Sequence, residues 1–280
     1  MRDYPKVIEI QFHNRCNSNC LICPYKDMNY KYEEMTDDLF HKFLDEIDES
    51  KLERLIPYLN NEPFLNSNFL DRVEEIRKRF KKVEIEISSN VSVITERDLE
   101  RLINLDITEL RLSVFGYTNE TYKKMMPNLN HDKTFEKLRI ISKYMKNTNT
   151  IVSIVMIDNN EIEEFEFESM KKLCDELGFK FERWGFLDRS NNVKYKSNNI
   201  LNKNVCTCEQ NRPIERMHIL SDGRVIFCCQ DWSHSVVLGN IKDNTISEIW
   251  NGEKYNKVRE SLYNKNCESP MICQLCKLGH

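Results

Sequence analysis

Short apolar segments alternate with longer segments of helical periodicity through the first two thirds of the chain. Residues 7–12, VIEIQF, are apolar and rich in β-branched side chains, which favours a strand. Residues 36–50 carry apolar side chains at helical spacing, with Thr36 as the expected N-cap. Further strands are expected at 54–59, 83–88, 109–114, 150–157 and 179–184. Further helices are expected at 67–80, 96–105, 131–145 and 161–177, the last closed by Gly178.

This alternation predicts an α/β fold in which parallel strands are joined by crossover helices. Six such units are too few for a closed eightfold barrel, so an open partial barrel and a doubly wound sheet both fit. In either arrangement, functional side chains gather at the C-terminal ends of the strands. The asparagine-rich segment 190–204 is expected to be a linker, which divides the chain into domains at 1–195 and 196–280.

Composition narrows the class of protein. The 280 residues carry a formal charge of −4, so no basic excess points to nucleic acid. The chain has no run of 18 apolar residues and no secretory signal pattern at its start, so we expect no membrane partner. We therefore expect a reducing, cytoplasmic location.

Eleven cysteines are many for that compartment, and clustered cysteines there are typical of metal ligands or catalytic thiols. Cys174 stands alone on an apolar helix face and is expected to be a buried thiol. Three cysteines follow the first predicted strand: Cys16, Cys20 and Cys23. Seven lie beyond residue 205: Cys206, Cys208, Cys228, Cys229, Cys267, Cys273 and Cys276.

The first group is one ligand short of a closed four-ligand site. Three thiolates on an iron–sulfur cube leave one iron open to a small molecule, and a zinc site completed by His13 is the alternative. The spacing C-x3-C-x2-C on a loop after the first strand resembles the radical S-adenosylmethionine (radical SAM) superfamily. The resemblance implies a partial (β/α)6 TIM-like barrel and a 4Fe–4S cluster whose open iron binds SAM. Reductive cleavage of SAM then gives a 5′-deoxyadenosyl radical that abstracts a hydrogen atom.

Other segments resemble landmarks of the same family at the expected strand ends. NNEP at 60–63 is similar to the Gly-Gly-Glu-Pro segment that holds the SAM amino group, with two asparagines in place of the glycines. SSN at 88–90 resembles Thr-Asn-Gly, with Val91 where glycine is usual. The SAM-binding residues implied are Asn60, Asn61, Glu62, Pro63, Ser89, Asn90, Ser113 and Arg189.

The second cysteine group resembles the SPASM/Twitch tail of radical SAM enzymes. Its pattern is C-x14-G-x4-C from Cys208, closed by C-x2-C at Cys273 and Cys276, with a hairpin expected at Asp222-Gly223. The resemblance implies one auxiliary 4Fe–4S cluster on Cys208, Cys228, Cys273 and Cys276. Structural zinc on the same set is the alternative, and Cys206 or Cys267 could replace a member.

Three residues are candidates for catalysis. Cys229 follows a ligand, so its side chain should point away from the cluster, and it could return a hydrogen atom to a substrate radical. Asp231 could act as a base, and Arg189 could clamp a carboxylate of SAM or substrate.

The resemblance leaves the substrate open. We expect a small polar molecule such as a sugar or aminocyclitol, which is dehydrogenated or epimerised, with flavodoxin or ferredoxin as electron donor. The alternatives are a peptide-modifying enzyme, which epimerises or cross-links a peptide, and an iron–sulfur electron carrier. Since only fifteen residues precede Cys16, no fused peptide-binding domain is expected.

Overall fold

The computed structural model describes residues 3–195, 201–202, 205–263 and 268–279. The chain forms two compact units. The first unit comprises Met1–Asn14, Asp27–Asn61 and Leu187–His280, and the second comprises Arg15–Lys26 and Glu62–Phe186.

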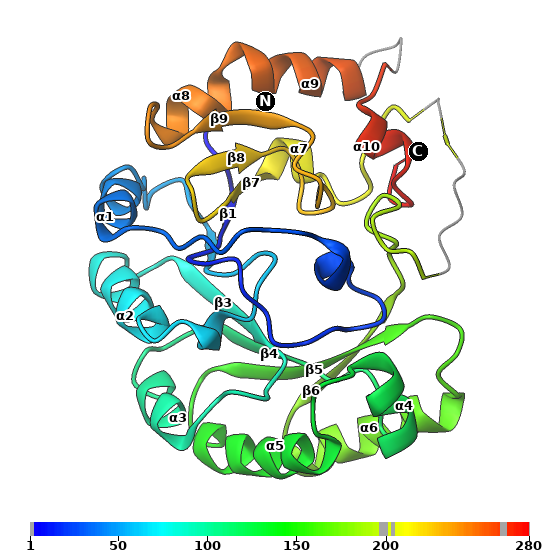
Figure 1. Ribbon diagram of the computed structural model, residues 1–280. Helices are drawn as coiled ribbons and strands as arrows, with labels where there is room; N and C mark the ends of the chain where they lie inside the picture. The colour runs from blue at the N-terminus through cyan, green and yellow to red at the C-terminus, as the bar shows by residue number, and fades with distance from the viewer. Residues whose placement is uncertain (1–2, 196–200, 203–204, 264–267, 280) are drawn as a thin grey trace. The chain divides into compact units, whose positions relative to one another are not determined.

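The second unit is a parallel α/β layer (Figure 1). Its sheet has the order β6-β5-β4-β3, and each neighbouring pair is parallel. The strands are β3 (Glu84–Ser89), β4 (Glu109–Ser113), β5 (Ile151–Asp158) and β6 (Lys180–Gly185). The helices are η2 (Pro63–Leu65), α2 (Phe69–Arg79), α3 (Glu96–Leu102), α4 (Asn119–Met125), α5 (His131–Met145) and α6 (Glu164–Leu177).

The first unit joins strands from the two ends of the chain in the order β2-β1-β7-β8-β9. β1 is parallel to both β2 and β7, whereas β8 is antiparallel to β7 and β9. The strands are β1 (Val7–Ile10), β2 (Arg54–Ile56), β7 (Arg216–Ile219), β8 (Arg224–Ile226) and β9 (Val237–Asn240). The helices are α1 (Asp37–Asp45), α7 (Arg212–Glu215), α8 (Ile246–Asn251), α9 (Glu253–Tyr263) and α10 (Met271–Gln274). The short helix η1 (Pro24–Asp27) belongs to the second unit up to Lys26.

Local sequence signals explain several element boundaries. The Thr36 hydroxyl accepts a hydrogen bond from Leu39 N at 3.3 Å and caps α1, as predicted. α6 ends at Gly178, whose φ of 73° is left-handed, also as predicted. The predicted hairpin turn holds Gly223 at a φ of 86° between β7 and β8.

The α/β class with parallel strands is confirmed, and it is consistent with a partial TIM-like barrel. The sequence pattern missed the short helix α4 and the parallel pairing of β1 with β7. The division at 195/196 stays a prediction, because the compact units combine segments from both sides of it. The predicted linker lies partly outside the described residues.

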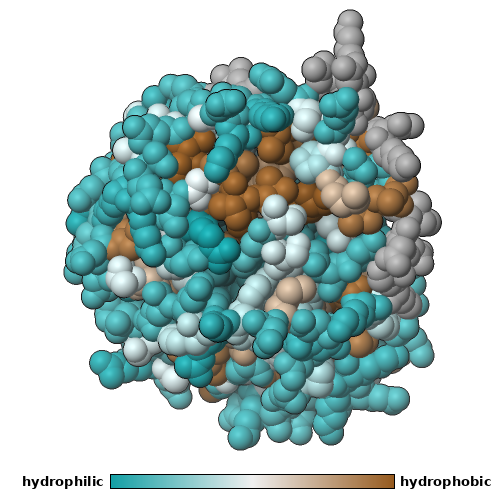
Figure 2. Space-filling model, turned by 45° about the horizontal axis from the view of Figure 1, so that its top comes forward, coloured by the Kyte–Doolittle hydropathy of each residue, from teal (hydrophilic) through white to brown (hydrophobic). Residues whose placement is uncertain are grey.

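Hydrophilic residues cover most of the face drawn in Figure 2, and hydrophobic ones gather in smaller groups. Among the described residues, no helix combines the length and apolar character needed to cross a bilayer.

We predict that Gly223→Ala destabilises the protein more than Gly178→Ala. Both glycines have positive φ, so either alanine costs about 1–2 kcal/mol in backbone strain. Only at position 223 does a new Cβ meet close neighbours, 2.6 Å from Asn240 Oδ1 and 3.2 Å from a Leu39 methyl. Overpacking adds a further ~1–3 kcal/mol there. Urea denaturation midpoints measure the difference, and equal midpoints would contradict this account of the hairpin.

Candidate functional site

Cys16, Cys20 and Cys23 lie on the loop that follows β1, and all three belong to the second unit. The loop turns back on itself through local contacts. Cys23 N donates to Cys20 O at 3.1 Å, and the Ser18 hydroxyl lies 3.0 Å from the Cys20 sulfur. Cys16 N donates to the Tyr25 hydroxyl at 2.8 Å, which fixes the start of the loop against its end.

The three thiols influence one another electrostatically. Burial raises the pKa of Cys16 to about 12, and the negative charges of Glu62 and Cys23 raise it too. Burial and then the charges of Cys23 and Cys16 raise the pKa of Cys20. Such thiols keep their protons unless a metal displaces them, because the metal's positive charge removes the penalty for ionisation. The donor set therefore fits an iron–sulfur cluster with three cysteine ligands.

Glu62 connects the cysteine loop to the end of β3. Its backbone N donates to Arg15 O at 2.9 Å. Its carboxylate is 2% exposed and accepts hydrogen bonds from Ser89 Oγ and Asn90 N, both at 2.7 Å. Burial raises the pKa of Glu62 to about 7, although these hydrogen bonds act in the opposite direction. The structure thus brings together three of the residues that the sequence implied for SAM.

The loop after β3 closes a small polar network on the same unit. Asn90 Nδ2 donates to Asn17 Oδ1 at 2.8 Å, and Asn17 Nδ2 donates to Ser92 Oγ at 2.8 Å. Val91, which lies between Asn90 and Ser92 in the sequence, has a φ of 72°, which is unfavourable for a β-branched residue. Its N–H donates to Ser89 Oγ at 3.0 Å. The position where the family usually has glycine therefore has a left-handed conformation in this chain, although its residue is valine.

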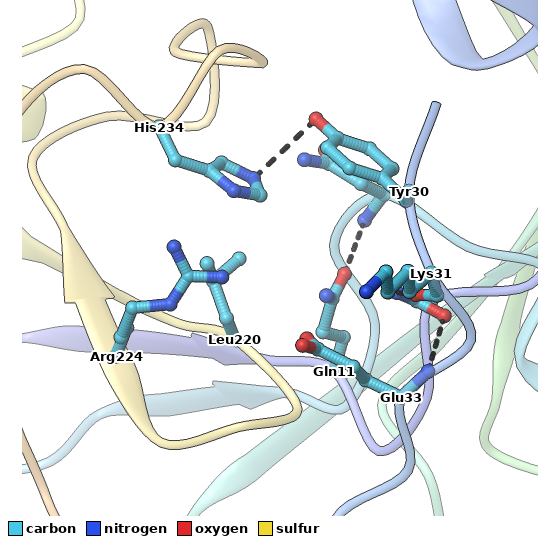
Figure 3. A pocket seen from close by; sticks show the side chains of 9 residues that line it. Gln11, Tyr30, Lys31, Glu33, Leu220, Arg224 and His234 are labelled. Carbon is cyan, nitrogen blue, oxygen red and sulfur yellow. Dashed lines mark hydrogen bonds between the residues drawn. The ribbon is translucent and has the colours of Figure 1, made fainter. Parts of the chain in front are cut away.

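Asn60 and Asn61 end the first-unit segment that precedes Glu62. Asn60 is 6% exposed, and its backbone N donates to Gln11 Oε1 at 3.1 Å. The side-chain Nδ2 atoms of both asparagines are buried without a hydrogen-bond partner. Asn60 and Gln11 line a polar cavity of the first unit (Figure 3). Pro63 begins η2, and Ser113 is the last residue of β4, as predicted.

A second cavity, also within the first unit, is lined by the four predicted auxiliary ligands: Cys208, Cys228, Cys273 and Cys276. A β-bridge between Cys208 and Gly279 draws the C-terminal segment beside the first cysteine. Cys276 N donates to Cys273 O at 3.1 Å, which closes the C-x2-C turn. Cys206 is disulfide-bonded and is not a free thiol, and Cys267 lies outside the described residues.

Charge in this cavity favours a bound metal centre. Burial raises the pKa of Cys273 to about 12, and the charges of Cys276 and Cys208 raise it too. Arg212 lines the same cavity, and its buried Nε has no hydrogen-bond partner. Burial lowers the pKa of Arg212, but the negative charges of Cys229 and Cys228 outweigh burial and raise the pKa overall. Four thiols beside a buried guanidinium fit a centre that converts the thiols to thiolates.

Arg189 contacts the same part of the unit. With the Gln230 amide oriented to satisfy its neighbours, its oxygen accepts from Arg189 Nη1 at 2.8 Å and from Arg212 Nη1 at 3.0 Å. Arg189 is in a turn with a φ of 54°. The predicted role of Arg189 as a carboxylate clamp stays a prediction.

Asp231 is buried by contacts with its own loop. Its carboxylate accepts hydrogen bonds from Ser233 Oγ at 3.0 Å, Ser235 N at 2.9 Å and Val236 N at 2.8 Å. Its exposed fraction is 1%. These contacts give Asp231 a structural role in residues 231–236 and lend no support to the predicted role as a base.

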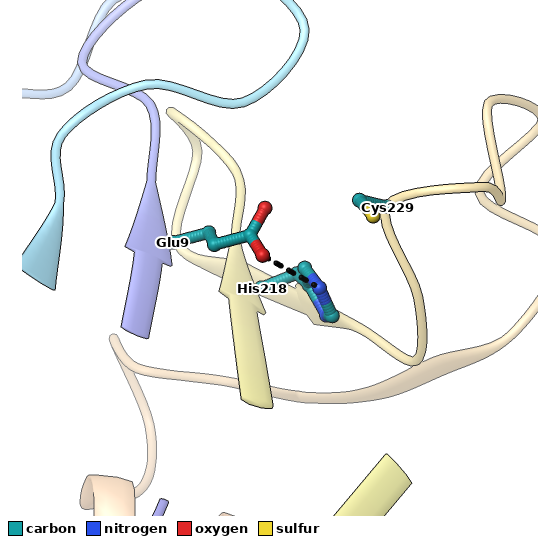
Figure 4. Close-up of side chains that lie close together, drawn as sticks. All are labelled: Glu9, His218 and Cys229. Atoms are coloured by element: carbon teal, nitrogen blue, oxygen red, sulfur yellow. Dashed lines mark ion pairs between the residues drawn. The ribbon is translucent and has the colours of Figure 1, made fainter. Parts of the chain in front are cut away.

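Cys229 lies against a second group of side chains, although its thiol also hydrogen-bonds that of Cys228. Its sulfur, an imidazole nitrogen of His218 and a carboxylate oxygen of Glu9 all lie within 4.8 Å of one another (Figure 4). His218 Nε2 is 3.5 Å from Glu9 Oε1, and Arg216 Nη1 is 2.9 Å from the same oxygen. Because Arg216 forms an ion pair with Glu9, this group is better described as a thiol beside an ion pair than as a cation site.

The charges of this group depend on its neighbours. Burial lowers the pKa of His218. The charge of Glu9 and a hydrogen bond with Cys229 outweigh burial and raise this pKa to about 9. A hydrogen bond from Cys228 is the largest cause that lowers the pKa of Cys229. A metal-bound Cys228 has no proton to donate, so this contribution belongs to the metal-free pair, whereas Arg212 and His218 also lower the pKa of Cys229. Sequence reasoning missed Glu9 and His218, and a charged residue inside the apolar strand VIEI was the available signal.

Comparison with known families decides the identity. The Radical SAM superfamily matches residues 10–167, more than half of the chain, and the SPASM iron–sulfur cluster-binding domain matches residues 206–277. The chain belongs to the radical SAM superfamily. It carries a C-terminal SPASM-type domain, and its cofactors are SAM, a 4Fe–4S cluster and an auxiliary iron–sulfur cluster.

Proteins similar to this chain carry names that indicate different targets. The tungsten-containing aldehyde ferredoxin oxidoreductase cofactor-modifying protein of Pyrococcus furiosus is 21% identical, over 98% of this chain and 87% of its own. The SAM-dependent 2-deoxy-scyllo-inosamine dehydrogenase of Niallia circulans is 21% identical, over 96% of this chain and 92% of its own. The structure of Streptococcus suis SuiB bound to the precursor peptide SuiA has a TM-score of 0.76 at 14% identity, over 99% of this chain and 70% of its own.

We predict that Cys228→Ala lowers the iron content of the anaerobically reconstituted radical SAM protein from about eight to about four per chain. The reason is that Cys228 lines the four-cysteine cavity, whereas Cys229 does not. Cys229→Ala should therefore keep about eight irons, and it serves as the matched control. Elemental analysis of iron, sulfide and zinc measures this. About four irons and one zinc in the unmodified protein would instead show a zinc site in the tail.

We predict that Glu62→Gln weakens SAM binding about tenfold or more, since a hydrogen bond to a charged group is worth about 1.5–3 kcal/mol. Because the pKa of Glu62 is raised to about 7, its carboxylate ionises as pH rises. Binding of the SAM ammonium group should then strengthen between about pH 6 and pH 7.5 in the unmodified protein and not in the variant.

Anaerobic calorimetry with reconstituted protein measures both effects. Glu84→Gln, an exposed carboxylate at the start of β3, is the matched control and should bind SAM normally. Equal affinities for the Glu62 variant and this control would remove Glu62 from the SAM site.

Proposed function

We propose that this radical SAM enzyme abstracts a hydrogen atom from a small polar substrate, such as a sugar or an aminocyclitol, and dehydrogenates or epimerises it. SAM and the cluster, when bound, supply the 5′-deoxyadenosyl radical that removes the hydrogen atom. The observation that carries the proposal is the placement of Cys229. Its thiol faces Glu9 and His218, while the preceding Cys228 lines the four-cysteine cavity.

Epimerisation requires a hydrogen-atom donor on the protein. In that outcome the S–H bond of Cys229 breaks and a C–H bond forms on the substrate radical, which leaves a thiyl radical at Cys229. In a dehydrogenation the substrate radical instead loses one proton to a base and one electron to an acceptor of the iron–sulfur class. Cys229 is needed in the first outcome and not in the second, so its role distinguishes them.

The substrate class rests on similarity. One relative is by name a 2-deoxy-scyllo-inosamine dehydrogenase, which supports a small polyhydroxylated substrate. The structure of SuiB with its precursor peptide supports the second candidate, a peptide-modifying enzyme that epimerises or cross-links its substrate. A flavodoxin or ferredoxin would supply the electron for SAM cleavage. A reducing cytoplasm, in which cysteine ligands stay reduced, is part of the proposal.

We predict that the reconstituted protein, given SAM and dithionite, forms 5′-deoxyadenosine. With a true substrate in deuterated water, an epimerase should incorporate one deuterium from the exchangeable Cys229 thiol. Cys229→Ala should then still form 5′-deoxyadenosine but give product without the label. A dehydrogenase should instead give a product two hydrogens lighter, and Cys229→Ala should not change it. Mass spectrometry of nucleoside and product measures both.

The matched control is Cys174→Ala, which removes a buried thiol from α6 in the second unit. It should behave as the unmodified protein in both assays. Intact clusters without cleavage of SAM would reject the enzyme and favour an electron carrier.

A further inference from the structure

The first unit contains a polar cavity distinct from the four-cysteine cavity (Figure 3). It is open at the surface and has carboxamide, aromatic, cationic and carboxylate side chains around it. Its floor continues the sheet: Gln11 and Leu220 lie just beyond the ends of the paired strands β1 and β7, two residues after Glu9 and His218 respectively. Two residues of strand span about 7 Å and return to the same face. The cavity therefore lies next to Cys229 along one face of the sheet.

Backbone contacts hold the walls of the cavity in place. Asn14 Nδ2 donates to Lys31 O at 2.7 Å, and Asn14 Oδ1 accepts from Glu33 N at 3.0 Å. Gln11 Oε1 accepts from Asn60 N at 3.1 Å. Two carboxamides thus fix the surrounding backbone, so the remaining side chains are presented from a rigid frame.

Asn60 gives the clearest sign of a missing ligand. The residue is 6% exposed and lines the cavity, yet its Nδ2 has no hydrogen-bond partner. Buried polar groups are almost always paired, and the described residues supply no partner for this donor. An acceptor such as a hydroxyl or an anionic oxygen would satisfy it.

An aromatic pair forms another wall. The rings of Tyr30 and His234 stack with centroids 5.1 Å apart and an interplanar angle of 2°. The Tyr30 hydroxyl donates to Trp232 O, which anchors the pair to the loop after β8. Burial, and then the charge of Arg224, lower the pKa of His234, so its ring is neutral at physiological pH. This wall offers a hydroxyl and a neutral ring and adds no charge.

The charges around the cavity favour a negative ligand. Arg224 and Lys31 lie on opposite sides of it, and Glu33 is the single carboxylate among the described lining residues (Figure 3). Arg224 Nε donates to Asp222 Oδ2 at 2.5 Å, which orients the guanidinium and leaves its Nη groups on the other side. A protonated amine in this space would meet Arg224 and Lys31 as well as Glu33, whereas an anionic oxygen could accept hydrogen bonds from both cations.

We propose that this cavity binds the substrate, and that the substrate is a polyhydroxylated compound with one anionic group, either a carboxylate or a phosphate. This inference rests on the proposed function and narrows its substrate class. Arg224 and Lys31 bind the anionic group, and Gln11, Asn60 and Glu33 hydrogen-bond the hydroxyl groups. The position of the cavity on the sheet face directs the reacting carbon toward Cys229.

Calorimetry on anaerobically reconstituted protein with SAM tests the assignment with four probes. These are D-glucuronate, D-glucose 6-phosphate, neutral D-glucose and cationic D-glucosamine. At least one anionic probe should bind about tenfold or more tightly than the neutral and cationic probes, since each charge-assisted contact is worth that much. Whichever of glucuronate and glucose 6-phosphate binds more tightly identifies the anionic group as a carboxylate or a phosphate. Preference for glucosamine, or no binding of either anion, would overturn the proposal.

Two variants of Arg224 make the result specific to the cavity. Arg224→Gln should weaken the anionic probe about tenfold, and Arg224→Lys should restore part of the loss. Arg97→Gln, an exposed arginine of α3 in the second unit, is the matched control and should bind normally. An unchanged affinity in Arg224→Gln would also overturn the proposal, and an iron count of each variant confirms that it folds.

SAM cleavage separates this inference from the proposed function. If Arg224→Gln and the unmodified protein both form 5′-deoxyadenosine but neither prefers an anionic probe, the radical chemistry stands and the cavity assignment fails. If no 5′-deoxyadenosine forms, the proposed function fails whatever the probes show.

Discussion

The parallel pairing of β1 with β7 is the constraint on which the first unit depends. It joins residues from opposite ends of the chain in a continuous register, from Val7 with Arg216 to Ile10 with Ile219. That register places Glu9 against His218 and leaves Gln11 to continue the ladder through Ile219 O at 3.1 Å. Because side chains alternate across a strand, a slip of one residue would turn Glu9 and Gln11 to the opposite face. Both the Cys229 group and the polar cavity would then be lost.

Interactions between residues close together in the sequence made much of the fold predictable. Helical periodicity and a capping threonine identify α1, a left-handed glycine ends α6, and Asp222-Gly223 turns the tail hairpin. Each of these features depends on residues within a few positions of one another. The cysteine spacings are local in the same sense, and the four tail cysteines do line one cavity. Signals of this kind survive in a single sequence because no distant partner is needed to produce them.

Features that depend on long-range register were not predictable. In the sequence, Glu9 is one polar residue in an apolar strand and His218 is one residue of a short tail segment. Only the pairing of β1 with β7 brings the two residues together. The role of Asp231 as a base stays a prediction, and the sequence did not indicate that Ser233, Ser235 and Val236 would donate hydrogen bonds to its carboxylate. Val91 shows the limit of motif transfer, because a β-branched residue takes a left-handed conformation at a position where the family usually has glycine.

The balance of buried charge supports a metal centre in the tail independently of the cysteine spacing. Glu9 is compensated by Arg216 at 2.9 Å and by His218. Arg212 makes no ion pair with a carboxylate among the described residues, yet it is buried beside the cysteines. A buried cation without an anionic partner is destabilising, and neutral thiols do not compensate its charge. Thiolates held by a metal do compensate it, so the burial of Arg212 is explained when the four cysteines are ionised ligands.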